Sequence, residues 1–291
     1  MGVQGLTTWG EERALAAQVA IVTGASSGIG HATALRLKSA GFAVYAGARR
    51  VAKMKDLADA GIQTVDLDVT DDTSMVALVD RVIAETGRID VLVNNAGYGA
   101  FGALEDVPNA EGRRQFDVNV FGLARMTQLV LPHMRAQKSG RIINMSSMGG
   151  RIYEPLGSWY HATKFAVEGM SDSLRLEVSP FGIHIVLIEP GGMNTEWGAI
   201  AADSLIAASA GTAYADQAPG VAKLLRSVDR KARPSSSPDR IAKAVTRAAT
   251  ARRPKVRYLL GPGAKPLVAL HTILPNRVFD RMMARVFQTP H

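Results

Sequence analysis

Residues 19–30 read VAIVTGASSGIG, an apolar run that passes directly into a glycine-rich turn. An apolar run without alternation is typical of a strand that is covered on both faces. The glycines allow the backbone to turn tightly and to approach a bound group closely. A helix that starts near Ile29 then presents unpaired N–H groups and the positive end of its dipole, which together bind phosphate. The stretch predicts a strand, a phosphate-binding turn and a helix, with contact residues Thr23, Gly24, Ser26, Ser27, Gly28, Ile29 and Gly30.

The alternation of apolar runs with helical patterns continues to residue 261. Strands are expected at 19–24, 43–48, 62–69, 90–94, 141–147, 184–190 and 256–261. Helices are expected at 29–40, 51–60, 73–86, 111–137, 160–178 and 239–251. Strand–helix–strand units at this spacing form right-handed crossovers in a parallel sheet. The sequence therefore predicts an α/β protein: a doubly wound parallel sheet, or Rossmann fold, of about seven strands with helices on both faces.

Three segments fall outside this alternation. Residues 1–17 are expected to be a loose extension, because glycines interrupt any helical pattern there. Residues 192–237 form a long insert within the Rossmann domain, which is expected to span 18–261. An insert after the end of a strand often covers a site, so we favour a lid over a surface excursion without function. Residues 262–291 are expected to form a C-terminal helical extension that Pro275 splits in two.

The composition excludes several classes of protein. Of the 291 residues, 47% are hydrophobic and 21% are charged, which is typical of a globular chain and not of a disordered one. No apolar run reaches the roughly 18 residues of a membrane-spanning helix, and no secretory signal is readable. The chain has no cysteine, which excludes disulfides and thiolate metal sites. A reducing, cytoplasmic location is expected.

The net charge of +8 is concentrated near the C-terminus. Residues 1–220 hold 18 Lys and Arg against 23 Asp and Glu, whereas residues 221–291 hold 16 against 3. A basic segment of this kind can bind nucleic acid or a membrane surface. It lacks zinc-ligand spacing, interleaved aromatic residues and a long basic helix, so no nucleic-acid partner is expected. Residues 264–287 mix apolar and basic residues; we expect them to cover a pocket or a subunit interface, with a peripheral membrane contact as the alternative.

Arg49, at the end of the second expected strand, bears on the choice of dinucleotide. In this type of fold an acidic residue there binds the ribose 2′-hydroxyl of NAD(H), whereas an arginine can pair with the 2′-phosphate of NADP(H). The sequence reads Ala48-Arg49-Arg50 and has no acid nearby. NADP(H) is therefore favoured over NAD(H), unless both arginines simply begin an exposed helix.

Tyr160 and Lys164 are four residues apart in an expected helix, so their side chains share one face. Ser147 ends the fifth expected strand, at the carboxyl edge where open α/β sheets bind their ligands. A tyrosine is a poor acid or base at neutral pH, but an adjacent ammonium favours its phenolate. Tyr160 could then exchange a proton with a carbonyl or alcohol oxygen that Ser147 holds.

These motifs occur in a definite order along the chain. The glycine turn is followed by Asn94-Asn95-Ala96-Gly97, Asn119, Ser147, Tyr160-x-x-x-Lys164 and Pro190-Gly191. In this order the sequence resembles the short-chain dehydrogenase/reductase family over about residues 18–261. The stretch from Trp159 to Gly169 and the long C-terminus resemble the branch that contains 17β-hydroxysteroid, retinol and acyl-dihydroxyacetone-phosphate reductases.

The resemblance implies an oxidoreductase that transfers a hydride between NADP(H) and a carbonyl or secondary alcohol. It implies a catalytic tetrad of Asn119, Ser147, Tyr160 and Lys164, with Asn119 distorting its helix. Relatives are often oligomers, so a homo-oligomer is expected. The resemblance further implies cofactor contacts at Asp68, Val69, Asn95, Ala96, Gly97, Tyr160, Lys164, Pro190, Gly191 and Thr195. One departure is Ser26-Ser27, where many NADP-using members carry a basic residue, so the preference for NADP(H) depends on Arg49.

The expected substrate pocket is apolar. Its candidate lining residues carry no arginine cluster that could pair with a phosphate or carboxylate, which predicts a steroid-, retinoid- or lipid-like substrate. Two alternatives stay open: a redox sensor that binds NADP(H), and a family member with non-redox chemistry such as an epimerase. No metal site is expected, because His133, His161 and His184 lack ligand spacing. The candidate lining residues are Met148, Tyr153, Trp159, Met193 and Trp197.

Overall fold

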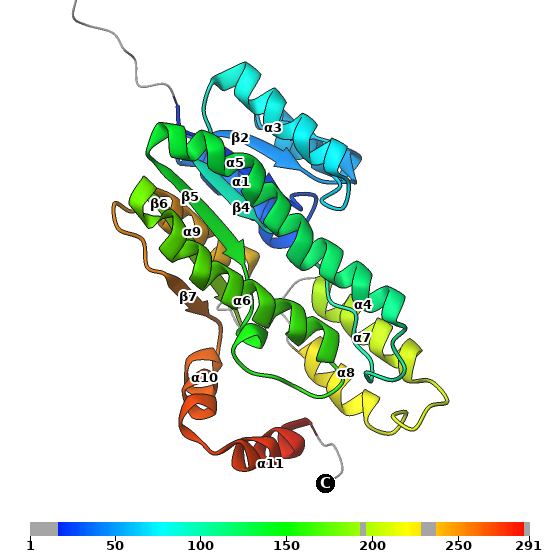
Figure 1. The fold of residues 1–291 in the computed structure, drawn as a ribbon. Coiled ribbons are helices and arrows are strands. Elements are labelled where there is room, and N and C mark those ends of the chain that lie inside the picture. The colour runs from blue at the N-terminus through cyan, green and yellow to red at the C-terminus, as the bar shows by residue number, and fades with distance from the viewer. Residues whose placement is uncertain (1–16, 193–195, 228–236, 288–291) are drawn as a thin grey trace, which may run out of the picture.

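The computed structural model describes residues 17–192, 196–227 and 237–287 of the chain. At its centre is one parallel sheet of seven strands in the order β3-β2-β1-β4-β5-β6-β7 (Figure 1). The strands are β1 (Val19–Thr23), β2 (Ala43–Gly47), β3 (Gln63–Val65), β4 (Val91–Asn94), β5 (Gly140–Met145), β6 (Ile183–Pro190) and β7 (Arg257–Leu260). The predicted doubly wound sheet is therefore confirmed. The predicted extension 1–17 lies outside the described residues, except for residue 17.

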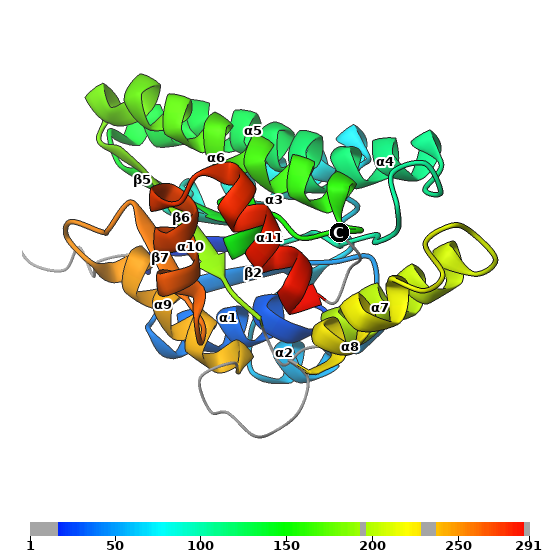
Figure 2. The same ribbon diagram turned by 90° about the horizontal axis from the view of Figure 1, so that it is seen from below.

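Helices cover both faces of the sheet. Successive side chains of a strand point to opposite faces, so each strand contributes to an apolar layer on either side. Ala20 and Val22 pack in the apolar layer on one face, and Val19 and Ile21 pack in the layer on the other. Figure 2 shows the two helical layers on either side of the strands. The first layer holds α1 (Gly28–Ser39), η1 (Val51–Met54), α2 (Lys55–Asp59) and α9 (Pro238–Thr250); the second holds α3 (Asp72–Thr86), α5 (Leu123–Gln137) and α6 (Ser158–Val178).

The third strand is shorter than the predicted 62–69. It pairs only with β2, from Tyr45 opposite Gln63 to Gly47 opposite Val65. Beyond it the chain turns, because the Asp68 carboxylate accepts hydrogen bonds from the Thr70 N–H at 2.9 Å and the Thr70 hydroxyl at 2.7 Å. An edge strand has no second neighbour to extend it, so this turn ends the pairing.

The predicted helix 111–137 is also corrected. It consists of α4 (Asn109–Phe116) and α5, joined by the π-helical turn η2 (Asp117–Gly122). A π-helical turn inserts extra backbone into a helix and is frequent at functional sites. Here the turn carries Asn119, which agrees with the helix distortion that the family resemblance implies.

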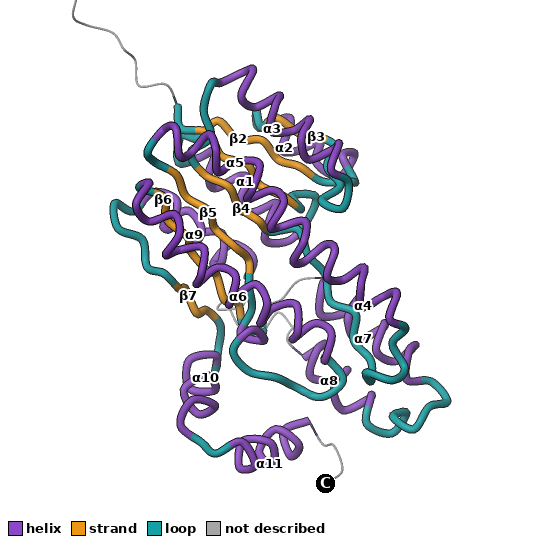
Figure 3. The backbone as a smooth tube through the Cα atoms, in the orientation of Figure 1, coloured by secondary structure: helices purple, strands orange, loops and turns teal. Residues whose placement is uncertain are grey.

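Four helices at the carboxyl end of the sheet surround a third apolar cluster (Figures 2 and 3). The helices α7 (Glu196–Ser209) and α8 (Ala218–Ser227) come from the insert, and α10 (Ala264–Ile273) and α11 (Asn276–Phe287) follow β7. The split at Pro275 is as predicted, whereas α8 was not predicted: its Pro219 is tolerated because it lies in the first turn. None of the described helices combines the length and the apolar character that a membrane span requires.

Candidate active site

The turn after β1 has the backbone conformation that its glycines predict. Gly24 and Gly28 have φ angles of +68° and +57°, a region that side chains disfavour. A Cβ atom on Gly30 would lie 2.4 Å from the Asn95 side-chain nitrogen. Side chains would therefore block the turn at all three positions, which explains the spacing of the glycines.

Thr23 and Asn95 join the turn to the end of β4. The buried Thr23 hydroxyl accepts hydrogen bonds from the N–H groups of Asn95 and Ala96, both at 3.0 Å. In return the Asn95 amide donates to the carbonyls of Thr23 at 2.9 Å and Gly24 at 3.1 Å. Because β1 and β4 are neighbours in the sheet, this clamp holds two expected cofactor segments together.

The start of α1 fits a bound phosphate. Its N-cap Ser27 is extended, and within the described residues the Ser27 side chain makes no capping hydrogen bond. The first N–H groups of α1 therefore lack the side-chain acceptor that usually binds them. Together with the close approach at the glycines, this is the arrangement that an anionic pyrophosphate would complete.

Arg50 as well as Arg49 lies beside the glycine turn. Arg50 lies 3.4 Å from the Ser26 hydroxyl and 3.5 Å from the Ser27 hydroxyl. Arg49 acts electrostatically on Asp68: burial would raise the pKa of that carboxyl, but hydrogen bonds from Thr70 and the charge of Arg49 lower it below its usual value. Arg50 is not among the contact residues predicted from the sequence, although its place beside Arg49 indicates it.

Ser147 and Tyr160 meet at the carboxyl ends of β5 and β6. The Ser147 hydroxyl accepts a hydrogen bond from the Gly149 N–H at 3.0 Å and donates to the Pro190 carbonyl at 3.4 Å. It also hydrogen-bonds to the Tyr160 phenol. Burial raises the pKa of Tyr160 above its ordinary value, and the bond with Ser147 offsets only part of that shift. Burial therefore favours the protonated form of the phenol.

Lys164 and Asn119 complete the predicted tetrad. The Lys164 ammonium donates to the Met145 carbonyl at 2.9 Å and lies 5.9 Å from the centre of the Tyr160 ring. Burial lowers its pKa to about 8, against the opposing charge of Glu168. Asn119 bonds to both backbone groups of Tyr98 and donates to the Thr163 hydroxyl at 3.1 Å. It thus ties the π-helical turn to α6 beside Lys164.

His161 joins the start of α6 to the loop after Ser147, a contact that the sequence does not predict. Its Nε2 accepts a hydrogen bond from the Glu154 N–H at 3.1 Å, so its Nδ1 is the atom that donates to the Gly149 carbonyl at 2.8 Å. Burial lowers the pKa of His161, which favours this neutral form. The ring thereby fixes the loop that begins at Ser147. Its position directly after Tyr160 is the feature of the sequence that could have indicated this contact.

The five expected substrate residues do not all lie together. Met148 and Tyr153 pack on the third apolar cluster, which contains Tyr160. Tyr153 donates to the Asp280 carboxylate at 2.7 Å and contacts the Phe279 ring at 5.5 Å, so α11 closes this side of the cluster. Met193 and Thr195 lie outside the described residues, as does the side chain of Trp197.

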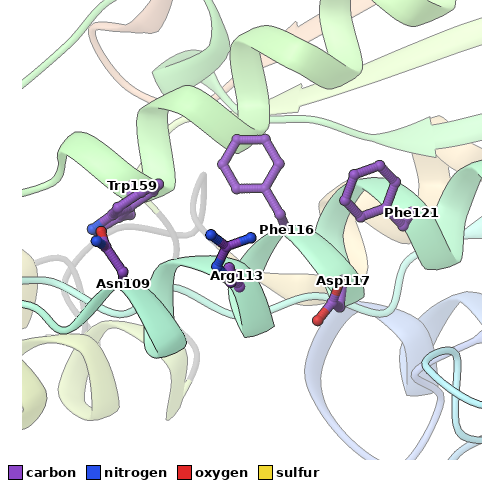
Figure 4. A pocket seen from close by; sticks show the side chains of 6 residues that line it. All are labelled: Asn109, Arg113, Phe116, Asp117, Phe121 and Trp159. Atoms are coloured by element: carbon purple, nitrogen blue, oxygen red, sulfur yellow. The ribbon is translucent and has the colours of Figure 1, made fainter.

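Trp159 packs elsewhere, which corrects its prediction as a lining residue of the same pocket. Its indole covers Gly112 of α4 and meets the Phe116 ring edge-on at 6.3 Å. Consecutive helical residues point about 100° apart, so Trp159 cannot share the direction of Tyr160. It lines a separate hollow of about 460 Å³ with Asn109, Arg113, Phe116, Asp117 and Phe121 (Figure 4).

Comparison with known proteins identifies the family. A profile described as short chain dehydrogenase matches residues 18–203. The chain belongs to the short-chain dehydrogenase family. A probable short-chain type dehydrogenase/reductase of Helicobacter pylori is 35% identical, over 92% of this chain and 97% of that protein. A 3-ketodihydrosphingosine reductase of Bacteroides thetaiotaomicron is 36% identical, over 87% of this chain and 91% of that protein.

Solved structures of the short-chain dehydrogenase family share the fold. One from Streptomyces avermitilis has a TM-score of 0.77 at 34% identity and covers 94% of this chain and 96% of its own. A metagenomic short-chain oxidoreductase in complex with NADP has a TM-score of 0.65 at 29% identity, over 84% and 96% of the two chains. A 3-ketoacyl-(acyl-carrier-protein) reductase of Brucella melitensis, complexed with NADH, has a TM-score of 0.67 at 27% identity and covers 81% of this chain and 91% of its own. The chain is thus an oxidoreductase of a family that binds nicotinamide cofactors.

Replacing Thr23 with valine is expected to lower the free energy of unfolding by about 1 to 3 kcal/mol, because the partly buried N–H groups of Asn95 and Ala96 lose their acceptor. Thr33 is the matched control: it is fully buried, and its hydroxyl has no hydrogen-bond partner in the described part of the chain. Thr33→Val should leave stability unchanged or raise it. Urea denaturation measures both, and equal losses in the two variants would contradict the clamp.

Proposed function

We propose that this protein is an NADPH-dependent reductase of apolar carbonyl compounds, with the corresponding alcohol oxidation as the reverse reaction. The observation that carries the proposal is the position of Tyr160, which borders an apolar cluster while its phenol bonds to Ser147. Lys164 lies on the same helix, one turn further along. Proton-transfer groups are thus next to a surface that suits a water-insoluble substrate.

The chain's own residues would supply proton transfer and orientation. Ser147 and Tyr160 would both hydrogen-bond to the carbonyl oxygen, which polarises the carbonyl for attack. Tyr160, kept protonated by burial, would donate its proton to the developing alkoxide. The Lys164 ammonium would then stabilise the phenolate that remains. NADPH, when bound, supplies the hydride for the carbonyl carbon.

NADP(H) is the cofactor that the two arginines favour. Arg49 and Arg50 are exposed side chains beside Ser26, Ser27 and Asp68, where a 2′-phosphate would place two negative charges. The remaining contacts are those expected from the sequence: the glycine turn, Asp68 and Val69, Asn95 to Gly97, and Pro190 with Gly191. Relatives include complexes with NADP and with NADH, so a direct comparison of the two cofactors is the deciding measurement.

The substrate class is steroid-, retinoid- or lipid-like. Phe101, Leu205 and Phe279 of the apolar cluster are fully buried, and they come from a loop, the insert and the C-terminal helices. A relative named as a 3-ketodihydrosphingosine reductase supports the lipid-like alternative. The insert 192–237 would serve as a lid over this cluster, because its helices α7 and α8 pack on the cluster.

Tyr160→Phe is expected to reduce turnover at least about 100-fold, because phenylalanine keeps the ring but cannot donate the proton. NADPH oxidation is measured against steroid, retinal and long-chain ketones, and NADPH binding is followed by fluorescence as the control. Binding should persist in the variant. Full activity in the variant would overturn the proposal, and NADPH binding without turnover of any substrate by the unmodified protein would favour the redox sensor or a non-redox enzyme such as an epimerase.

Replacing both Arg49 and Arg50 with alanine is expected to raise the KM for NADPH by about 10-fold or more, because charge-assisted bonds to a phosphate are lost. The KM for NADH should change little. Lys53→Ala is the control, since Lys53 is an exposed cation of η1 close in sequence. Equal changes for the two cofactors would contradict the assignment of the arginines to a 2′-phosphate.

A peripheral membrane contact through residues 264–287 is the last part of this proposal. On α10, Leu270 and Ile273 are 40% and 77% exposed. Exposed basic side chains flank them at Lys265, Arg277 and Arg281, which suits an anionic lipid surface. Phosphatidylcholine vesicles with added phosphatidylserine should sediment the protein, and Ile273→Asp should abolish sedimentation. Binding that is equal in the variant would exclude this contact.

A homo-oligomer is also proposed, because members of the family commonly form oligomers.

A further inference from the structure

A cluster of buried charges lies directly behind the catalytic lysine. Glu168 is one helical turn after Lys164 on α6 and is 5% exposed. Glu189, the penultimate residue of β6, is 1% exposed. Two carboxylates withdrawn from water require compensating charge close by.

Arg257 of β7 supplies that charge to both carboxylates. Its guanidinium donates from Nε and Nη2 to Glu168 Oε2, both at 3.1 Å. The same Nε lies 3.0 Å from Glu189 Oε1, and Nη2 also donates to Asp172 Oδ2 at 2.6 Å. One side chain of the last strand therefore joins α6 to β6.

The cluster also reaches the loop that carries Ser147. Arg151, in the loop after Ser147, lies 3.5 Å from Glu189 Oε1. Glu189 precedes Pro190, whose carbonyl accepts the Ser147 hydrogen bond. A Cβ atom on Gly150 would lie 3.0 Å from Glu168 Cγ and 2.9 Å from the Lys164 carbonyl, so the Ser147 loop rests directly on this part of α6.

Stability is a weak explanation for such a cluster. Burying ion pairs costs about as much in desolvation as their attraction returns, and apolar replacements are often neutral or stabilising. Charged groups in this position instead bias the protonation of their neighbours. The neighbour whose charge matters most to the proposed reaction is Lys164, because its ammonium stabilises the Tyr160 phenolate.

We infer that Glu168 and Arg257 are positioning residues of the active site: Glu168 holds Lys164 in its charged form, and Arg257 fixes Glu168 and Glu189 beside the Ser147 loop. This inference rests on the proposed function. It assigns a role in the site to β7, a strand that lies beyond the residues matched by the family profile.

The sign of the effect follows from the charges around Lys164. Removing the negative charge of Glu168 lowers the pKa of every neighbouring group, whether acid or base. Burial already lowers the pKa of Lys164 to about 8, so a further decrease brings loss of its proton into the neutral range. Burial and the charge of Glu168 also raise the pKa of Glu189 to about 7.

Other charged and titratable groups surround Lys164 and Glu168. They are Tyr160, Asp172 and Arg175 of α6, Glu189 of β6, Arg257 of β7 and Arg151 of the Ser147 loop.

The test is the pH profile of kcat in Glu168→Gln, which keeps the shape and hydrogen-bonding capacity of the side chain but removes its charge. We expect both the acidic and the alkaline limb of the pH profile to move to lower pH by about one unit, with the affinity for NADPH unchanged. Glu177→Gln is the matched control, because Glu177 is an exposed residue of the same helix. Its profile should coincide with that of the unmodified protein. A Glu168→Gln profile that is lowered at every pH without moving would show a merely structural role and overturn the inference.

Arg257→Lys and Arg257→Met separate charge from geometry. The lysine keeps the charge but cannot reach both carboxylates, so it should lower kcat while keeping the positions of the limbs. The methionine should lower kcat and move the limbs to higher pH, because it removes a positive charge. Equal kcat and profiles in all three proteins would overturn the role of Arg257.

Failure of the proposed function is distinguishable from failure of this inference. If the unmodified protein turns over no carbonyl compound, the proposed function fails. The inference is then tested by the pH titration of the Lys164 side chain, followed by NMR and assigned by the absence of its signal in Lys164→Met. Glu168→Gln should lower the pH of that transition, and an unchanged transition would overturn the inference.

Discussion

The structure depends on one constraint: a parallel sheet that is covered by helices on both faces leaves only the ends of its strands for polar chemistry. β1 sits at the point where the strand order reverses, with β2 on one side and β4 on the other. The loops that follow β1 and β4 therefore meet at the carboxyl edge. Thr23 and Asn95 join them through hydrogen bonds between side chains and backbone. The glycine turn, the tetrad and the apolar cluster all lie around this edge.

Burial at that edge shifts the pKa values of two predicted catalytic groups in opposite directions. It raises the pKa of Tyr160 and lowers the pKa of Lys164, because both shifts favour the uncharged form. A neutral phenol suits proton donation, but a neutral lysine could not stabilise the phenolate that results. The buried carboxylate of Glu168 opposes the second shift. The role inferred for Glu168 is therefore a consequence of placing the tetrad in an apolar setting.

The sequence predicted the parallel sheet and the order of its strands along the chain, and it indicated a candidate tetrad, because each leaves a local signal. Apolar runs mark buried strands, and spacing of four residues aligns Tyr160 with Lys164. The errors occurred where a local pattern was overridden. Strand β3 is short because it lies at the edge of the sheet, and the helix around Asn119 contains a π-helical turn. Trp159 directly precedes Tyr160 in α6, so helical periodicity turns its side chain toward α4 and away from the apolar cluster that contains Tyr160.

The sequence by itself thus determined the parallel sheet and most of its covering helices and indicated which residues could perform the chemistry, since backbone preference and side-chain period are properties of short stretches. Only the tertiary structure decided which side chains support them. Arg257 reaches Glu168 across 89 positions of the chain, and Tyr153 reaches Asp280 across 127. The contacts of Arg50 with Ser26 and Ser27 likewise join separate elements. Such contacts depend on how whole helices and strands pack, and no short stretch of sequence contains that information.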